Sequence, residues 1–262
     1  MCRHLAYLGP PVTLAEMVLL GPHSLLHQSW APREMRGGGT INADGFGVGW
    51  IDTETGGAAR RYRREIPIWS DASLPDLAAS VSSGAILAAV RSATVGMPVT
   101  HTACAPFVEG PWMFSHNGVV AGWPASVAVL ADDLLAVDLM TLCAPTDSAF
   151  LWALVRQRLG EGQSAARALA GVADEVLALA PGSRLNLLLN DGVTIAATTA
   201  GHALWYRQGD RSVTVSSEPI DPDQEGWQPV PELSLLEATA SQCSIQSLDN
   251  PATKDGHERA KS

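Results

Sequence analysis

The second residue of the chain has the side chain best suited to chemistry. The sequence begins Met1-Cys2-Arg3, and a residue as small as cysteine at this position is compatible with removal of the initiator methionine. Cys2 would then carry a thiol and a free α-amine. An amine with a pKa of about 8 is partly neutral at pH 7 and can accept the proton of a thiol with a pKa of about 8.5. Cys2 is therefore a candidate nucleophile with its own base, or else a buried thiol without a catalytic role.

Two apolar runs lead directly into polar residues. Residues 84–90 are almost entirely apolar and precede Arg91, and a second run over 112–116 ends on Asn117-Gly118. Short continuous apolar runs are typical of buried strands. We therefore expect Arg91 and Asn117 at strand ends, where they could meet a ligand. Each has an ordinary alternative, a surface ion pair for Arg91 and a hairpin turn for Asn117-Gly118.

The residues between and around these sites predict strands and helices within one domain over 2–246. Residues 247–262 are polar, so we expect them to form a disordered tail. Thr13 is the expected cap of a first helix that ends at Gly21-Pro22, and Thr146 or Asp147 caps a later one. We expect strands over 3–8, 42–51 (which begins with a turn), 60–67, 84–91, 112–116, 184–189, 193–199, 204–208, 212–217 and 233–239. The expected helices after the first are 74–81, 149–159 and 165–179. Long loops are expected over 22–44 and 92–107.

Glycine occupies alternate positions in the strand expected to end at Ile51. Gly45, Gly47 and Gly49 lie on one face and the larger Val48 on the other, because successive residues of a strand point to opposite sides. We expect another part of the molecule to approach the bare backbone closely. A dinucleotide fingerprint is disfavoured because the third glycine spacing is wrong and no helix follows.

The composition narrows the partners of the protein. The 262 residues carry a net charge of −10 and the pI is about 5.1, so nucleic acid and anionic membranes are unfavourable partners. The apolar runs are too short to span a membrane. The four cysteines form no CxxC pair and no signal peptide precedes them, which favours a reducing cytoplasm and disfavours structural zinc. We expect no metal or cofactor, and the sequence leaves the oligomeric state open.

The order of these motifs resembles a known family. Cys2, the segment 91–94, the turn at 115–118 and Thr146-Asp147-Ser148 occur in the order found in class II glutamine amidotransferase domains. The resemblance covers nearly the whole ordered chain. It implies an α+β fold of four layers, αββα, in which two stacked antiparallel sheets lie between helices, as in N-terminal-nucleophile hydrolases.

The resemblance also implies a role for each motif. Cys2 would attack the γ-carbonyl of a γ-glutamyl amide, and the Asn117 side chain and Gly118 N–H would stabilise the oxyanion. Arg91 would bind the substrate α-carboxylate and Asp147 the α-ammonium group. His116, Ser148 and Thr94, which belong to the same motifs, are expected to contact the substrate.

A closer resemblance lies in the first fifty residues. The segments 1–5, 28–33 and 42–50 are similar to the actinobacterial amidohydrolases of ergothioneine biosynthesis, which remove glutamate from γ-glutamyl-hercynylcysteine sulfoxide. The resemblance implies a small-molecule substrate with a trimethylammonium group, for which Trp30 is a candidate contact because aromatic faces attract such cations. No remaining segment is long enough for an ammonia-using synthetase domain, so we expect plain hydrolysis.

Three alternatives remain open at this point. The first is a general glutaminase-type amidohydrolase that acts on glutamine or another γ-glutamyl compound. The second is a metal-binding module built on His23 and His27 with His4 or His101, although no cysteine or carboxylate motif supports it. The third is a non-catalytic domain that has kept the fold, which an unprocessed Met1 would favour.

Overall fold

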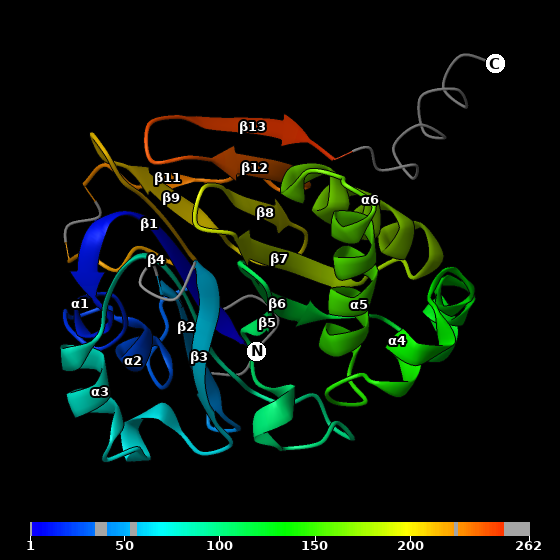
Figure 1. The fold of residues 1–262 in the computed structure, drawn as a ribbon, viewed down its shortest axis with the longest axis horizontal. Coiled ribbons are helices and arrows are strands. Elements are labelled where there is room, and N and C mark those ends of the chain that lie inside the picture. The colour runs from blue at the N-terminus through cyan, green and yellow to red at the C-terminus, as the bar shows by residue number, and fades with distance from the viewer. Residues whose placement is uncertain (1, 35–40, 53–56, 223–224, 249–262) are drawn as a thin grey trace.

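The computed structural model describes residues 2–34, 41–52, 57–222 and 225–248. Its strands form two antiparallel sheets, with short and long helices around them (Figure 1). The seven-stranded sheet has the order β11-β9-β10-β1-β4-β2-β3. Its strands are β1 (Arg3–Thr13), β2 (Phe46–Asp52), β3 (Ala58–Arg64), β4 (Ser82–Val90), β9 (Trp205–Gln208), β10 (Val213–Ser216) and β11 (Gln228–Pro229).

The second sheet has six strands in the order β13-β12-β8-β7-β6-β5. They are β5 (Phe107–Glu109), β6 (Trp112–Val119), β7 (Arg184–Asn190), β8 (Ile195–Thr199), β12 (Ser234–Ala238) and β13 (Cys243–Ser247). The helices are α1 (Leu14–Val18), α2 (Leu25–Gln28), α3 (Leu74–Ser80), α4 (Ala136–Met140), α5 (Asp147–Gly160) and α6 (Ala165–Leu179), with 3-10 helices at Ile68–Ser70, His101–Ala103 and Ala125–Asp133.

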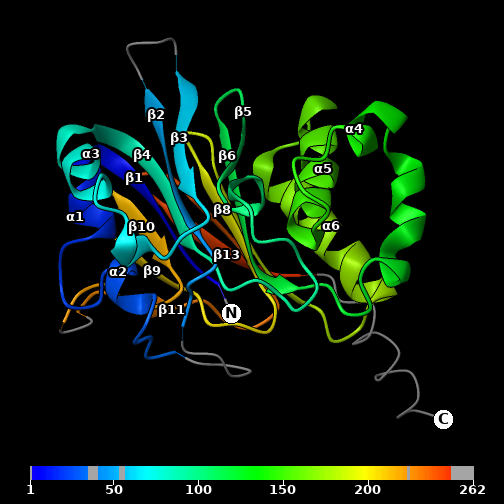
Figure 2. The ribbon, with the colours of Figure 1, turned by 90° about the horizontal axis from the view of Figure 1, so that it is seen from below.

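Four layers follow from the positions of the three apolar clusters. One cluster lies between α1–α3 and the seven-stranded sheet, one lies between the two sheets, and one lies between the six-stranded sheet and α5–α6. Figure 2 shows the sheets between the two groups of helices. The predicted αββα class is therefore confirmed. The reason is physical, because each sheet has two apolar faces and both must be covered.

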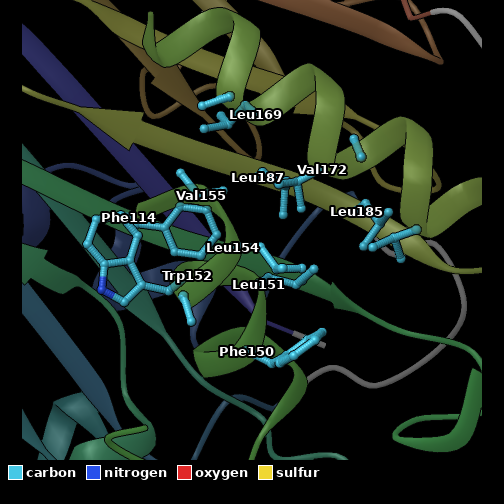
Figure 3. Packing of buried hydrophobic residues seen from close by; sticks show 14 of the residues in the cluster. Phe114, Phe150, Leu151, Trp152, Leu154, Val155, Leu169, Val172, Leu185 and Leu187 are labelled. Carbon is cyan, nitrogen blue, oxygen red and sulfur yellow. The ribbon is translucent and has the colours of Figure 1, made fainter. Parts of the chain in front are cut away.

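Helices α5 and α6 cover the outer face of the six-stranded sheet. Leu151, Val155 and Leu169 lie in one cluster with Leu187 of β7 (Figure 3). The α6 bounds match the prediction. The N-cap of α5 is Thr146, whose hydroxyl accepts a hydrogen bond from the Ala149 N–H at 3.2 Å, so Asp147 is free to point its carboxylate elsewhere.

Alternation along β1 and β6 determines which residues face the space between the sheets. Ala6 and Leu8 of β1 lie in the inter-sheet cluster, as does Met113 of β6. Cys2 is four residues before Ala6, and Asn117 is four residues after Met113, so each lies on the same face as that residue. Strand geometry thus directs both side chains toward the space between the sheets.

The alternating glycines of β2 allow the close contact that was expected. A Cβ at Gly47 would lie 2.2 Å from the Ala105 carbonyl oxygen, and one at Gly49 would lie 2.7 Å from the Pro106 ring. The segment before β5 therefore lies directly against the backbone of β2. This prediction is confirmed.

Several boundaries differ from the sequence-based expectations. Strand β1 continues past Gly9-Pro10-Pro11 to Thr13, with a register shift between Leu8 and Val12. Helix α2 lies inside the loop expected over 22–44, and β5 and β13 were not expected. Asn117 and Gly118 do not form a turn or a strand end, because they pair with Asn186 and Leu185 of β7 inside the sheet.

Regular structure continues past residue 246, and the expected domain boundary there stays a prediction. Strand β13 includes Ser247 and pairs with β12, and Leu248 is buried in the cluster beneath α6. Most of the expected tail, residues 249–262, lies outside the described residues.

Candidate active site

Cys2 lines a cavity at one end of the two sheets. The cavity also includes Arg91, directly after β4, and Ser115 and His116 of β6. Ser148 from the first turn of α5 completes the polar lining. Four predicted site residues, namely Cys2, Arg91, His116 and Ser148, therefore share one cavity although they are spread over almost 150 positions of sequence.

Strand pairing brings Cys2 and Arg91 together. Arg3 is opposite Val90 in the antiparallel β1–β4 ladder, so Cys2 and Arg91 are each one residue beyond the last pair. The Cys2 thiol lies 3.7 Å from the Ser92 carbonyl oxygen. The Arg91 guanidinium donates a hydrogen bond to the Pro98 carbonyl at 2.9 Å, which uses only part of its donor capacity.

Asn117 is fully buried and connected through Ser217 to β1, the strand that follows Cys2. The Asn117 amide donates to the Ser217 hydroxyl at 3.5 Å. The same hydroxyl accepts from the His4 N–H at 3.0 Å and donates to the His4 carbonyl at 3.2 Å. Asn117 is not among the residues that line the cavity, yet this contact ties its side chain to a residue two positions from Cys2.

Gly118 is held in a narrow space. A Cβ at this position would lie 1.8 Å from the Arg184 carbonyl oxygen and 2.7 Å from the His116 ring. Only glycine allows β7 to approach so closely. This packing requirement explains the residue without reference to catalysis, so its role as an oxyanion donor stays a prediction.

His116, Ser148 and Asp147 form a chain of polar contacts. The His116 Nε2 lies 3.0 Å from the Arg184 carbonyl and Nδ1 lies 3.0 Å from the Ser148 hydroxyl. Because a carbonyl can only accept, Nε2 carries a proton. The buried Asp147 carboxylate accepts from the N–H groups of Val120 at 3.1 Å and Ser148 at 2.7 Å.

Thr94 and Trp30 are not part of the cavity lining. Thr94 is exposed in the segment after Arg91. The Trp30 ring contacts the rings of His27 and Trp69, with centroids 5.6 and 5.8 Å apart, and 41% of Trp30 is exposed. The proposed contact of Trp30 with a trimethylammonium group stays a prediction.

Burial shifts the pKa values of two side chains near Cys2, those of His4 and Cys104. Desolvation lowers the pKa of His4 to about 3, with further contributions from His116, His202 and Arg3. Desolvation likewise raises the pKa of the Cys104 thiol, which lines the same cavity, to about 11. A neutral thiol and a neutral imidazole are therefore expected at these two positions at pH 7.

Sequence reasoning missed other polar residues that surround the site. The Ser115 hydroxyl lies 3.2 Å from His4 Nδ1, and Ser217 connects His4 to Asn117. The Asp44 carboxylate accepts from the Ala93 N–H at 2.8 Å, which holds the backbone after Arg91. Ser115 and Asp44 did carry a signal, since Ser115 belongs to the same short segment as His116 and Asp44 belongs to the segment 42–50 of the family resemblance.

The described residues do not bring the four histidines of the metal hypothesis together. His23 and His27 contact each other edge to face, at 5.6 Å between ring centroids. His4 contacts Ser115, and His101 lies 3.2 Å from the Glu65 carboxylate. Across the described part of the chain, no group of three or more metal-ligating side chains could hold an ion.

Within the residues that the structure describes, every helix is too short or too polar to cross a bilayer.

Comparison with known proteins identifies the family. Residues 17–209 match the model for glutamine amidotransferases class-II. A Mycolicibacterium smegmatis protein named gamma-glutamyl-hercynylcysteine sulfoxide hydrolase is 40% identical over 237 residues, which cover 90% of this chain and 95% of the relative.

Solved structures show the same fold. A glutamine aminotransferase class-II domain protein from Silicibacter pomeroyi has a TM-score of 0.64 and 24% identity, with 94% of this chain and 99% of that chain covered. The glutamine phosphoribosylpyrophosphate amidotransferase of B. subtilis has a TM-score of 0.66 and 14% identity, over 95% of this chain and 49% of that one. With an αββα fold that gathers Cys2, Arg91 and the His116 segment at one end of the sheets, the chain belongs to the class II glutamine amidotransferases.

Proposed function

We propose that this protein hydrolyses the γ-glutamyl amide bond of γ-glutamyl-hercynylcysteine sulfoxide and releases glutamate and hercynylcysteine sulfoxide. The observation that carries the proposal is the shared cavity of Cys2 and Arg91, a nucleophile beside a cation for the substrate carboxylate. The name of the Mycolicibacterium smegmatis relative supports the choice of leaving amine.

Two charged groups select the glutamyl end. The Arg91 guanidinium is suited to bind the α-carboxylate bidentately. Asp147 is proposed to bind the α-ammonium group. Its carboxylate accepts two backbone N–H bonds, from Val120 and Ser148, and a contact at 3.3 Å from the Ser148 hydroxyl. Since a carboxylate offers about four acceptor sites, capacity for a further donor remains.

The reaction then follows from Cys2. After removal of Met1, the α-amine of Cys2 takes the thiol proton and the sulfur attacks the γ-carbonyl carbon. Asn117 has an amide hydrogen beyond the one directed at Ser217, and with the Gly118 N–H it stabilises the oxyanion, by about 3 kcal/mol per donor. The C–N bond breaks as the amine returns the proton to the leaving nitrogen, and water hydrolyses the thioester to free glutamate.

The proposed setting is a reducing compartment, the cytoplasm. All four cysteines, Cys2, Cys104, Cys143 and Cys243, are free thiols in the structure, which supports this assignment because a thiol nucleophile must stay reduced.

Glutamate release from γ-glutamyl-hercynylcysteine sulfoxide tests the proposal. Cys2→Ser should lower kcat by at least about a thousandfold because the hydroxyl is a far weaker nucleophile, and Asn117→Ala should lower it about a hundredfold. Cys243→Ser, on the edge strand β13, is the control and should retain activity.

Full activity of Cys2→Ser would refute the mechanism. So would active protein in which intact-mass measurement finds the initiator methionine still attached. Faster turnover of L-glutamine than of the sulfoxide would favour the general glutaminase instead.

A further inference from the structure

A second, larger cavity adjoins the one that contains Cys2. Phe107 lines both cavities, and Ser148 lines the first where its neighbour Ala149 lines the second. The second cavity opens between β3, β5 and the α4–α5 region, and Figure 2 shows these elements side by side. A substrate whose glutamyl end lies at Cys2 has this space available for the group on the other side of the scissile bond.

Arg61 of β3 projects into the second cavity because of its register. It pairs with Gly49, while Arg63 pairs with Gly47, so both arginines lie on the face of the sheet that the glycines leave bare. The Arg63 guanidinium donates to the carbonyl of Cys104, a residue of the Cys2 cavity, at 2.9 Å. Arg60 points to the opposite face and lies 3.8 Å from the Asp52 carboxylate.

The two arginines that line the second cavity, Arg61 and Arg156, differ in their contacts with carboxylates. Arg156 contacts the carboxylates of both Asp138 and Glu109. Arg61 forms no ion pair with any carboxylate in the described part of the chain, and its side chain is exposed at the cavity. The site therefore offers an uncompensated guanidinium, which prefers a carboxylate that it can bind through two hydrogen bonds.

We propose that the second cavity binds the leaving group and that Arg61 recognises a carboxylate on it. The inference rests on the proposed function, in which the leaving amine belongs to a cysteine unit with its own carboxylate. Glutamine would release ammonia, which has no such group. Arg61 thereby selects γ-glutamyl amino acids over glutamine and over amides of simple amines.

Two matched substrates isolate this contact. γ-Glutamyl-S-methylcysteine and γ-glutamyl-S-methylcysteamine differ only in the carboxylate of the leaving group. Arg61→Ala should raise the KM for the first at least tenfold and leave kcat and KM for the second within twofold, while Arg61→Lys should recover part of the loss because it keeps the charge. Arg60→Ala, on the opposite face, should change neither substrate, and thermal melting verifies that each variant is folded.

The outcomes separate this proposal from the function on which it rests. Equal effects of Arg61→Ala on both compounds, or a wild-type enzyme indifferent to the carboxylate, would overturn the role of Arg61. Turnover of γ-glutamyl-S-methylcysteine without turnover of γ-glutamyl-hercynylcysteine sulfoxide would refute the proposed substrate and leave the Arg61 result valid. Calorimetric binding of both compounds to the Cys2→Ser variant gives the same comparison without catalysis.

Discussion

At the scale of single residues, the proposed oxyanion donor Asn117 contacts a residue outside the cavity lining, Ser217. Ser217 contacts His4 through both its backbone and its hydroxyl, and its hydroxyl also accepts from the Asn117 amide. Asn117 Oδ1 is buried without a hydrogen-bond partner among the described residues. We therefore propose that Ser217 orients the Asn117 amide and acts as a positioning residue.

Ser217→Ala should therefore lower kcat about tenfold with little change in KM, because the Asn117 donor is no longer held in the orientation that the oxyanion requires. Steady-state kinetics on the γ-glutamyl substrate measure both constants. Ser217→Thr keeps the hydroxyl and should restore most of kcat. If Ser217→Ala instead raises KM alone, Ser217 does not act through the oxyanion site.

At the scale of elements, β2 positions the wall of the Cys2 cavity by having glycine at two successive positions of one face, Gly47 and Gly49. The carbonyl of Ala105 occupies the space next to Gly47, and both Cys104 and Ala105 line the cavity. The contact is with backbone, which cannot move aside as a flexible side chain would.

Gly47→Ala should consequently destabilise the fold by about 1–3 kcal/mol, the usual cost of overpacking, and also reduce activity because the segment at Ala105 must shift. Urea denaturation and kinetics measure the two effects. The control is Gly160→Ala at the end of α5, where an added Cβ meets nothing within 4 Å and should not destabilise. An unchanged unfolding free energy for Gly47→Ala would contradict the close approach.

At the scale of the whole molecule, neutral histidines are buried where the sheets meet. His4 is fully buried and His202 is nearly so, and desolvation lowers the pKa of each to about 3. Unfolding returns them to ordinary values near 6.5. Between pH 6.5 and 3 the unfolded chain therefore binds protons that the folded protein does not, so this contribution to stability is complete above pH 6.5 and declines as the pH falls.

The expected slope is about 1.4 kcal/mol of unfolding free energy per pH unit for each histidine. His4→Asn should remove one such contribution, so its unfolding free energy should fall less steeply than wild type between pH 6 and 4 in urea titrations. Parallel curves for wild type and His4→Asn would show that His4 does not stay neutral in the folded protein.

Local patterns in the sequence were enough for much of the fold and part of the site. The apolar run before Arg91 defined a strand, the spacing over 165–179 defined a helix, and the glycines of β2 indicated a close approach. Each signal lies within a short segment, because strand alternation, helix periodicity and capping are properties of neighbouring residues. The chemical potential of Cys2 is also local, since thiol and amine belong to one residue.

Only the tertiary structure decided which distant residues meet. Asn117-Gly118 reads as a turn by itself, and its place inside β6 depends on pairing with β7 some seventy residues later. Ser217 contacts His4 across 213 positions, and Arg61 gains its significance from a cavity formed with α5. Such contacts leave no local signature, because their free energy comes from the packing of two sheets and not from the preferences of either segment alone.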